Sequence, residues 1–345
     1  MQPRRSTANK VFELTSIIIG AFIGAGFVSG REVAEYFAKY GFVSIVFAFG
    51  VSVLFYLFIK ICLCIGNKTG QCDKNTKYIF KKYNAIVNIL IIIACLINIG
   101  AMIAGCYTIG KIFNSNGLLY ILPIVSIILC FIVNLKKFGG ISFINKLVVP
   151  VLIILICLIC FTTIFKSSHV TILITNFYIS ILGGGVSSIV YVLFNMLLLG
   201  VLMLDIGGRY TIHEITTSSK ISACLIGILI TIISSSIILS DKGVILSDMP
   251  LLIECIAINK KFGVVFAVCQ FLGIFTTLIS SSYLVSNIFN QRLKSYAVCI
   301  IISLAIGIVI SFIGFYNIVD YLYKLTGILS VIFFLLLLKC TKRLK

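Results

Sequence analysis

Ten long apolar segments dominate the sequence and decide what the chain can fold into. A helix needs about 20 apolar residues to cross a bilayer, and unpaired backbone groups cannot face lipid. The strands of a membrane barrel would instead alternate apolar and polar residues. The sequence therefore predicts an all-α polytopic protein with ten transmembrane helices in contact with the lipid bilayer. The segments span roughly residues 11–29, 41–65, 85–113, 117–134, 147–166, 182–205, 219–240, 263–289, 295–314 and 317–339.

Charged residues are scarce and are concentrated between the apolar segments. Of the 345 residues, 60% are hydrophobic and 11% are charged, whereas soluble domains contain about 25% charged residues. The net charge of +18 is spread over short connecting segments, so nucleic acid is not expected as a partner. Most of the 13 cysteines lie inside apolar segments, where a thiol behaves as a small hydrophobic group. A disulfide framework is therefore excluded.

The distribution of lysine and arginine predicts the orientation of the chain. With a cytoplasmic N-terminus, 19 of the 28 Lys and Arg residues fall on the cytoplasmic side and 7 fall on the opposite side. Cytoplasmic loops carry the excess of positive charge in membrane proteins. Both termini are therefore expected in the cytoplasm.

The stretch Gly20–Glu32 breaks the rules of a lipid-facing helix. Glycine occupies four of its first eleven positions, and each glycine weakens a helix by about 1 kcal/mol relative to alanine. The GxxxG spacings allow close helix packing as one interpretation. Packing does not explain why Arg31 and Glu32 follow at once, whereas a helix that unwinds near Gly24–Gly30 and restarts does. The restarted helix would direct free N–H groups and its positive dipole end inward, which favours a carboxylate ligand.

Asp320 and Lys324 introduce opposite charges into the last apolar segment. They are four residues apart, so they share a helix face and can pair locally. The alternative interpretation is that Asp320 faces Arg31 near the outer end of the protein. Closing that pair would then gate access from outside.

Hydroxyl groups are dense in the eighth segment. Five of the seven residues from Thr276 to Ser282 carry one, and Thr277, Ser280 and Ser281 are predicted to share a helix face. Such hydroxyls either bond to their own helix or supply neutral oxygens to a dehydrated Na⁺. Both interpretations stay open.

Isolated polar residues mark the third and sixth segments. Asn195 and Tyr191 lie in the sixth segment, and Asn98 and Tyr107 lie in the third. An asparagine inside an apolar helix must form a hydrogen bond, and contact between helices is the simplest use of one. Substrate binding is the alternative. The sequence contains no cluster of titratable residues typical of a catalytic centre, so an enzyme is not expected.

The ten segments divide into two sets of five, residues 11–166 and 182–339, within a single transmembrane domain that is expected to cover residues 1–345. Because five is odd, the second set starts from the opposite side of the membrane, and any similarity between the sets is inverted. Inverted repeats with interrupted first helices are typical of one class of secondary transporter, whose substrate binds near the bilayer midplane. By this symmetry we expect a second interruption near Val192–Asn195.

Residues 24–32, which read GAGFVSGRE, resemble the signature of the YkvI-type bacterial membrane proteins. This family is placed with the amino acid–polyamine–organocation superfamily of permeases and its LeuT-like fold. Tyr191–Asn195 resembles the family pattern Tyr-x-x-Tyr-Asn, with phenylalanine in place of the second tyrosine. Phe275–Thr277 resembles the family's element in the eighth helix.

The resemblance implies a secondary active transporter in the bacterial cytoplasmic membrane that moves an amino acid or similar small solute by alternating access. No cofactor and no metal other than Na⁺ are expected, and the coupling ion stays open between Na⁺ and H⁺. An uncoupled channel or solute sensor on the same fold is the alternative. The candidate substrate-binding residues are Gly24, Ala25, Gly26, Phe27, Ser29, Gly30, Tyr107, Tyr191 and Asn195. The candidate ion-binding residues are Gly20, Ile23, Thr277, Ser280 and Ser281, and the candidate gate residues or proton carriers are Arg31, Glu32 and Asp320.

Overall fold

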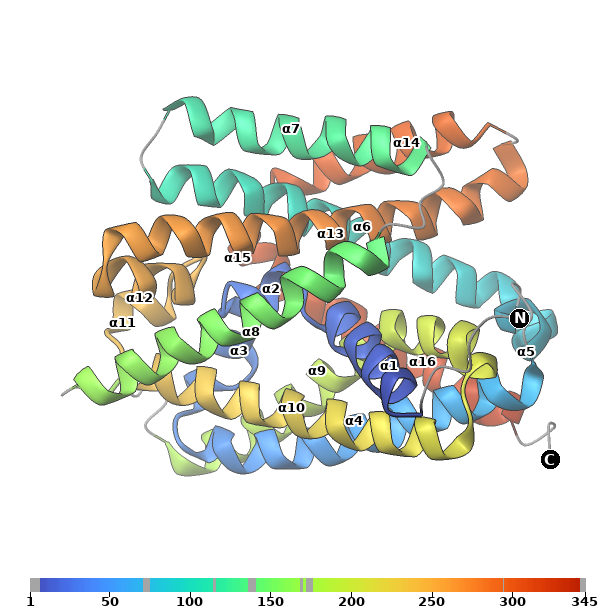
Figure 1. Ribbon diagram of the computed structural model, residues 1–345, viewed down its shortest axis with the longest axis horizontal. Helices are drawn as coiled ribbons and strands as arrows, with labels where there is room; N and C mark the ends of the chain where they lie inside the picture. Colours follow the sequence, from blue (N-terminus) through green and yellow to red (C-terminus); the bar gives the residue numbers. More distant parts are fainter. Residues whose placement is uncertain are drawn as a thin grey trace.

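The computed structural model is a bundle of long helices that lie side by side (Figure 1). It describes residues 7–70, 75–113, 116–135, 141–167, 170–171, 176–293 and 295–341. Within these residues, eight helical segments are long and apolar enough to cross a membrane, which confirms the prediction of an all-helical, multi-pass membrane protein. They are Val43–Thr69, Lys77–Ile112, Gly117–Leu135, Val149–Lys166, Phe177–Arg209, Ile212–Ile238, Lys260–Leu293 and Phe315–Cys340.

The other two predicted spans take shorter forms. The first is divided among α1 (Thr7–Phe22), α2 (Ala25–Val28) and α3 (Arg31–Tyr36). The ninth is α14 (Tyr296–Ser311), an apolar helix of 16 residues. The number of ten crossings and the cytoplasmic location of both termini therefore stay predictions.

The longer of the remaining helices lie close to the predicted apolar segments. Short helical turns join several of them, and Ile318–Leu322 forms a π-helical turn before the last helix. The helices are α4 (Val43–Thr69), α5 (Asn75–Phe80), α6 (Asn84–Ile112), α7 (Asn116–Leu135), α8 (Ile141–Lys166), α9 (Phe177–Ile206), α10 (Ile212–Ile238), α11 (Lys242–Ile245), α12 (Pro250–Ile258), α13 (Lys260–Leu293), α15 (Phe315–Asn317) and α16 (Tyr323–Thr341).

The interruption predicted in the first helix is present. Ile23 and Gly24 lie outside helical structure, and the Gly24 N–H donates to the Phe22 carbonyl at 2.9 Å. In a continuous helix that N–H would instead donate to the carbonyl of Gly20. A second irregularity follows at Gly30, whose φ of 78° places it in the left-handed region that favours glycine.

The predicted interruption of the sixth helix is wrong. α9 runs without a break from Phe177 to Ile206 and includes the stretch Val192–Asn195. The Asn195 side chain donates to the Tyr191 carbonyl one turn earlier, at 3.0 Å. Its polar group is therefore satisfied within its own helix, and neither glycine nor proline weakens the helix at that point.

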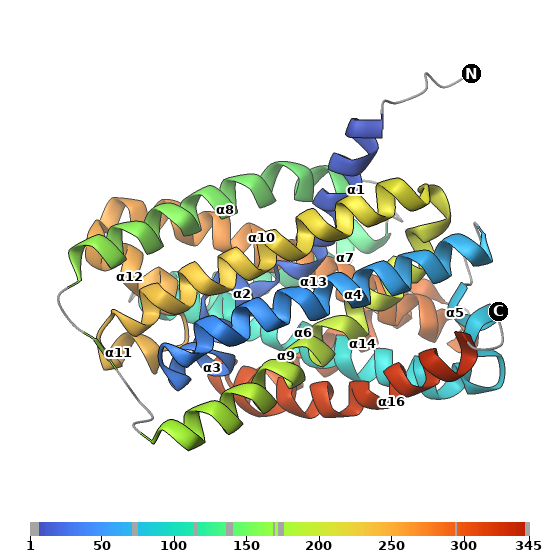
Figure 2. The same cartoon turned by 90° about the horizontal axis from the view of Figure 1, so that it is seen from below.

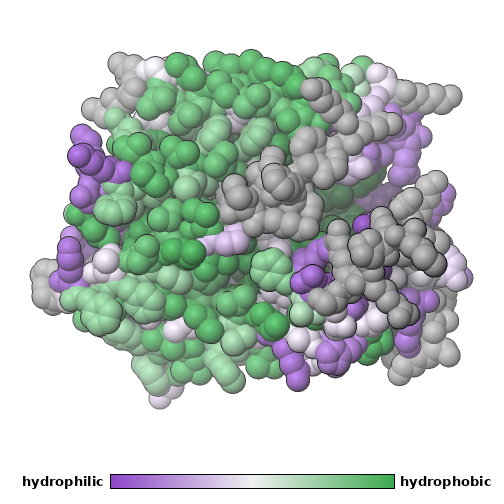
Figure 3. All heavy atoms as spheres, in the orientation of Figure 1, coloured by the Kyte–Doolittle hydropathy of each residue, from purple (hydrophilic) through white to green (hydrophobic). Residues whose placement is uncertain are grey.

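The two long connections lie at opposite ends of the bundle. α11 and α12 lie at the left end of Figures 1 and 2, and α5 lies at the right end of both. On the face drawn in Figure 3, a broad apolar surface covers the middle, and hydrophilic residues gather toward the ends. This distribution fits a membrane that surrounds the middle of the bundle. We call the end that carries α11 and α12 the outer end and the end that carries α5 the inner end, following the predicted orientation.

Glycines let long helices approach closely. A Cβ at Gly66 of α4 would overlap the Leu204 carbonyl of α9, and a Cβ at Gly207 would overlap the Leu63 carbonyl of α4. Membrane helices lack a hydrophobic force that drives them together and depend on such close packing. The segments α1 to α3 pack against α8, α9, α10 and α13, so the interrupted helix lies inside the bundle.

Candidate functional site

A cavity of about 710 Å³ lies among α1, α6, α9 and α13. Charged residues line one part of it, among them Glu13, Asp205 and Arg209, whereas Gly20 and Asn98 line another. Tyr210, also in its lining, accepts a hydrogen bond from Asn67 at the end of α4. The cavity therefore extends from the inner end of the bundle toward the interrupted helix.

Four of the five candidate ion-binding residues line this cavity, namely Gly20, Thr277, Ser280 and Ser281. The Thr277 hydroxyl donates to the Gly273 carbonyl at 3.0 Å, and the Ser280 hydroxyl donates to the Thr276 carbonyl at 2.9 Å. These bonds to their own helix are the first of the two interpretations drawn from the sequence, and they leave oxygen lone pairs free to accept.

The helix interruption faces this hydroxyl-rich surface. A Cβ placed on Gly24 would lie 3.8 Å from the Thr277 methyl group. The Gly20 carbonyl loses its usual helical donor, because the Gly24 N–H bonds to Phe22. Ile23, the fifth candidate ion-binding residue, is buried at this point and is not among the cavity-lining residues.

A chain of hydrogen bonds leads from the cavity to α16. The Asn98 side chain donates to the Ser281 hydroxyl at 3.0 Å, and its oxygen accepts from the Tyr323 hydroxyl at 3.0 Å. Phe194 stacks on the Tyr323 ring with centroids 4.3 Å apart. Tyr323 was not among the residues expected from the sequence, because nothing in the last segment distinguishes its position from those of the neighbouring tyrosines.

Glu32 lies in the first turn of α3, and its carboxyl group packs against Gly26 of α2. Only 4% of its surface is exposed, and a Cβ on Gly26 would lie 2.6 Å from its Cδ and would overlap one carboxyl oxygen. Glycine at position 26 is therefore what leaves room for the Glu32 carboxyl group. Glu32 approaches Tyr191 of α9 and Tyr323 of α16.

An aromatic cluster surrounds Tyr191. Its ring centroid lies 5.1 Å from that of Tyr36 and 5.2 Å from that of Phe37, and Phe22 and Phe55 each lie at 6.3 Å. All five residues are buried. Tyr191, a candidate substrate-binding residue, therefore lies beside the interrupted helix, although no interruption of α9 brings it there.

A network of charges joins α3 to α16 near the outer end. The Arg31 guanidinium donates to Glu35 at 3.0 Å, and Lys324 donates to both Glu35 and Asp320 at 2.5 Å. Lys39 also pairs with Glu35. The predicted direct pair between Arg31 and Asp320 is not formed: the two are connected through Glu35 and Lys324. Glu35 was missed, although its spacing of four residues from both Arg31 and Lys39 is a recognisable signal.

The same arginine holds the segment of α11 and α12 against the interrupted helix. Arg31 donates to the Ile245 carbonyl at 2.8 Å and lies 3.8 Å from the centroid of the Tyr316 ring. The Leu251 N–H donates to the Ser29 carbonyl at 3.0 Å. A Cβ on Gly30 would lie 2.8 Å from Leu251 Cγ. The segment 242–258 is therefore docked over the outer side of the interruption, and we call it the outer cap.

Glu254 anchors the outer cap to its neighbours. Its carboxylate accepts hydrogen bonds from Ser236 of α10 and from Ser240, which follows that helix, at 2.7 Å each, and from Thr163 of α8 at 3.4 Å. Burial raises the pKa of the Glu254 carboxyl group above its ordinary value, and the three hydroxyl donors oppose this rise.

The remaining candidate residues differ in position. Tyr107 is 41% exposed, packs against Tyr120 and does not line the cavity. Asn195 bonds to its own helix. Phe27 and Ser29 are buried within the interruption. The side chain of Ala25 lies outside the described residues.

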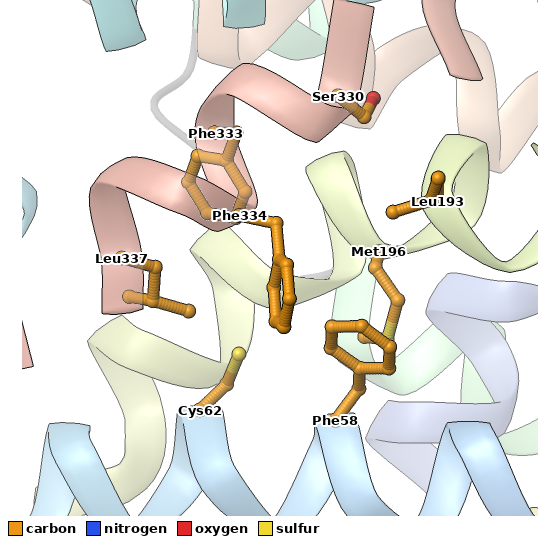
Figure 4. Close-up of a pocket in the computed structure, with 8 residues that line it drawn as sticks. All are labelled: Phe58, Cys62, Leu193, Met196, Ser330, Phe333, Phe334 and Leu337. Carbon is orange, nitrogen blue, oxygen red and sulfur yellow. The ribbon is translucent and has the colours of Figure 1, made fainter. Parts of the chain in front are cut away.

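A second, much smaller cavity lies among α4, α9 and α16 (Figure 4). Its volume is about 10 Å³, which corresponds to room for about one water molecule. Its lining is apolar apart from Ser330, and the rings of Phe58, Phe333 and Phe334 surround it. This space is a packing gap between helices.

An interrupted first helix, placed between an inner cavity and a closed outer side, defines a multi-pass membrane protein with a LeuT-like fold. No protein-family model matches the chain, and no curated protein matches its sequence.

Solved structures share the fold. The structure of MhsT in complex with L-phenylalanine matches with a TM-score of 0.66 and 13% identity, and the match covers 93% of this chain and 88% of that chain. A mutant of the Eremococcus coleocola manganese transporter matches with a TM-score of 0.64 and 14% identity, over 96% and 78% of the two chains. A second structure of that transporter, in complex with an aromatic bis-isothiourea substituted compound, matches with a TM-score of 0.50 and 14% identity, over 94% and 70%. At these identities the likeness establishes the fold.

Proposed function

We propose that the protein is a secondary active transporter that carries an amino acid or similar small organic solute by alternating access. One observation supports this most directly: the cavity reaches the interrupted helix from the inner end, whereas Arg31, Glu35 and Lys324 close the outer end. Alternating access requires a central site that is reached from one side at a time. A channel would need a path open at both ends, so this arrangement favours the carrier over the uncoupled alternative.

The chemistry of the site favours an organic solute over a transition metal. The described residues contain no group of three or more His, Cys, Asp and Glu side chains placed to hold a metal ion. Hydroxyl, amide and aromatic groups surround the interruption instead, including Asn98, Ser281 and Tyr191. MhsT, which shares the fold, binds L-phenylalanine. These features support an amino acid or a related compound as the substrate.

Two places are suited to a coupling ion. The Gly20 carbonyl and the hydroxyls of Thr277 and Ser280 offer neutral oxygens suited to Na⁺ between α1 and α13. Glu32 offers a buried carboxyl group suited to H⁺. Transport assays decide between the two ions.

The test is uptake of radiolabelled amino acids by proteoliposomes that contain the purified protein. We expect saturable uptake that requires a gradient of Na⁺ or of H⁺ across the membrane. Two ionophores, one that collapses only the Na⁺ gradient and one that collapses only the H⁺ gradient, identify the coupling ion. Flux that neither saturates nor depends on a gradient would contradict the proposal and favour a channel.

A further inference from the structure

The Glu32 carboxyl group occupies the position that a bound carboxylate was expected to take. The interruption was predicted to receive an anionic group from the substrate, but Glu32 lies against Gly26 inside it. Two carboxylates in one buried site repel each other and lose their hydration. A solute that enters here therefore meets a negative group of the protein.

No cation of the described chain neutralises Glu32. The groups that face it are the phenol rings of Tyr36 on α3, Tyr191 on α9 and Tyr323 on α16. The adjacent Arg31 points away and bonds to Glu35 and to the outer cap. A buried carboxylate without a cation is costly, so such a group takes up a proton or a positively charged ligand.

A phenol hydroxyl near Glu32 also lacks a partner. Within the described residues, the hydroxyl of Tyr36 is buried and forms no hydrogen bond, and the only carboxyl group near the hydroxyl of Tyr191 is that of Glu32. Leaving a buried polar group unpaired costs about 1–3 kcal/mol, so this arrangement suits a ligand that supplies the missing bonds. An ammonium group has three N–H donors, and it is also attracted to the faces of aromatic rings such as those around Tyr191.

We propose that Glu32 binds the positively charged amino group of the transported solute and holds a proton when no solute is bound. This inference rests on the proposed transport function and adds the class of substrate, namely amines and amino acids bound through their ammonium group. On binding, the Glu32 O–H bond breaks and the proton leaves to solvent. The carboxylate then pairs with the ammonium ion, so charge and atoms balance.

The route to this site begins at the inner cavity. Asn98 and Ser281 line the cavity, and Asn98 accepts a hydrogen bond from Tyr323, which lies beside Glu32. Tyr323 therefore connects the lining of the cavity to the surroundings of Glu32.

The experiment compares three probes that share one side chain: phenylalanine, phenethylamine and 3-phenylpropionate. Binding to the purified full-length protein is measured by thermal stabilisation and by titration calorimetry between pH 5.5 and 8.5. We expect phenylalanine and phenethylamine to bind, with affinity that rises by up to about tenfold per pH unit because binding releases a proton. A pH indicator in weak buffer should record about one proton released for each bound molecule. 3-Phenylpropionate should not bind.

Two variants at the site and one control complete the experiment. Glu32→Gln should weaken amine binding at least tenfold and abolish both the pH dependence and the proton release. The Tyr191→Phe variant keeps the Glu32 carboxyl group. It should therefore still release a proton on binding, while it binds the amine probes more weakly than the wild type does. Glu254→Gln changes another buried carboxyl group, in the outer cap, and should bind the probes as the wild type does.

Several outcomes would overturn the inference. Binding of 3-phenylpropionate, or amine binding that is unchanged in Glu32→Gln, would show that the solute is not held by its ammonium group. Gradient-driven uptake in that same variant would leave the proposed transport function standing while the inference fails. If no probe binds and no amino acid is taken up, both fail together.

Discussion

Lys324 of α16 donates to Glu35 of α3 across 2.5 Å and so connects the last helix to the restarted part of the first. Glu35 also forms ion pairs with Arg31 and Lys39, so three cations share one buried carboxylate. Removing one member of a buried, shared charge set leaves the others uncompensated. The closed state of the outer end therefore depends on Glu35 more than on Asp320, which pairs with Lys324 at the edge of the network.

We expect Glu35→Gln to loosen the outer cap. Among the residues that the structure describes, Lys324 would then keep only Asp320 as an anionic partner, and Arg31 would lose the partner that orients it toward the Ile245 carbonyl. Hydrogen exchange followed by mass spectrometry should show about tenfold faster exchange in peptides covering 242–258. Lys60→Gln is the control, because Lys60 is a lysine of α4 that donates to Tyr56 in the same helix. Unchanged exchange in the cap would contradict a gating role for Glu35.

A methyl group at position 26 should displace Glu32. In Gly26→Ala, the new Cβ would overlap the Glu32 carboxyl group, so amine binding should fall as in Glu32→Gln even though the carboxyl group is present. Calorimetry with phenethylamine measures the effect. The matched control is Gly50→Ala in α4, where a Cβ meets nothing within 4 Å. If the Gly26→Ala variant binds phenethylamine as tightly as the control does, the Glu32 side chain can move without loss of affinity. Its close contact with Gly26 is then not needed for binding.

Contact between the backbones of α4 and α9 should limit stability. We expect Gly66→Ala and Gly207→Ala each to destabilise the protein by about 1–3 kcal/mol, because each Cβ would overlap a backbone carbonyl that cannot rotate away. The thermal midpoint in detergent should fall for both variants. Gly50→Ala, which stands in the same helix as Gly66, should leave the midpoint unchanged or raise it. Equal midpoints for all three would contradict the close approach.

Glu254 should make stability depend on pH. Burial raises the pKa of its carboxyl group in the folded protein, so above its ordinary value of 4.5 the folded state binds more protons than the unfolded state does. Stability then falls as pH rises through this window. Glu254→Gln cannot titrate, so the thermal midpoint of the wild type relative to this variant should decrease from pH 4.5 to 7.5. A difference that stays constant with pH would contradict the raised pKa.

Substitution of Thr277 should distinguish coupling to Na⁺ from coupling to H⁺. If Na⁺ drives transport through the oxygens near Gly20, Thr277→Val should raise the Na⁺ concentration needed for half-maximal uptake at least tenfold, because the substitution removes one ligand oxygen but keeps the shape. Thr277→Ser, which keeps the oxygen, is the matched control. Proton-driven uptake should be unaffected by either substitution. A loss of H⁺-driven uptake in the valine variant alone would show that this hydroxyl serves another purpose.

The interrupted first helix and the uninterrupted α9 show why one of the two predicted breaks is present and the other is not. Around Gly24–Gly30, glycine lowers helix propensity over the whole stretch, and this local property is visible in the sequence. At Asn195 the prediction depended on symmetry between the halves of the chain. The asparagine instead bonds to Tyr191 in its own helix, a local alternative that the repeat argument ignored.

The charge network between α3 and α16 shows a different limit of prediction from the sequence. The sequence identified Arg31, Asp320 and Lys324 as unusual charges in apolar segments, and it permitted pairs four residues apart. It could not show that Glu35 of α3 pairs with Lys324 of α16, because the two helices are almost three hundred residues apart along the chain. The distance between them depends on how the whole bundle packs.

By itself the sequence determined the membrane environment of the chain and its local backbone structure. It showed apolar segments of membrane length, charged connections between them, and a glycine-rich stretch that does not stay helical. These follow from hydropathy and backbone propensity, which depend on neighbouring residues alone. Only the tertiary structure decided which polar groups meet. Glu32 lies beside Tyr191 and Tyr323 because α3, α9 and α16 pack together around it, and long-range packing depends on shape complementarity that no local pattern records.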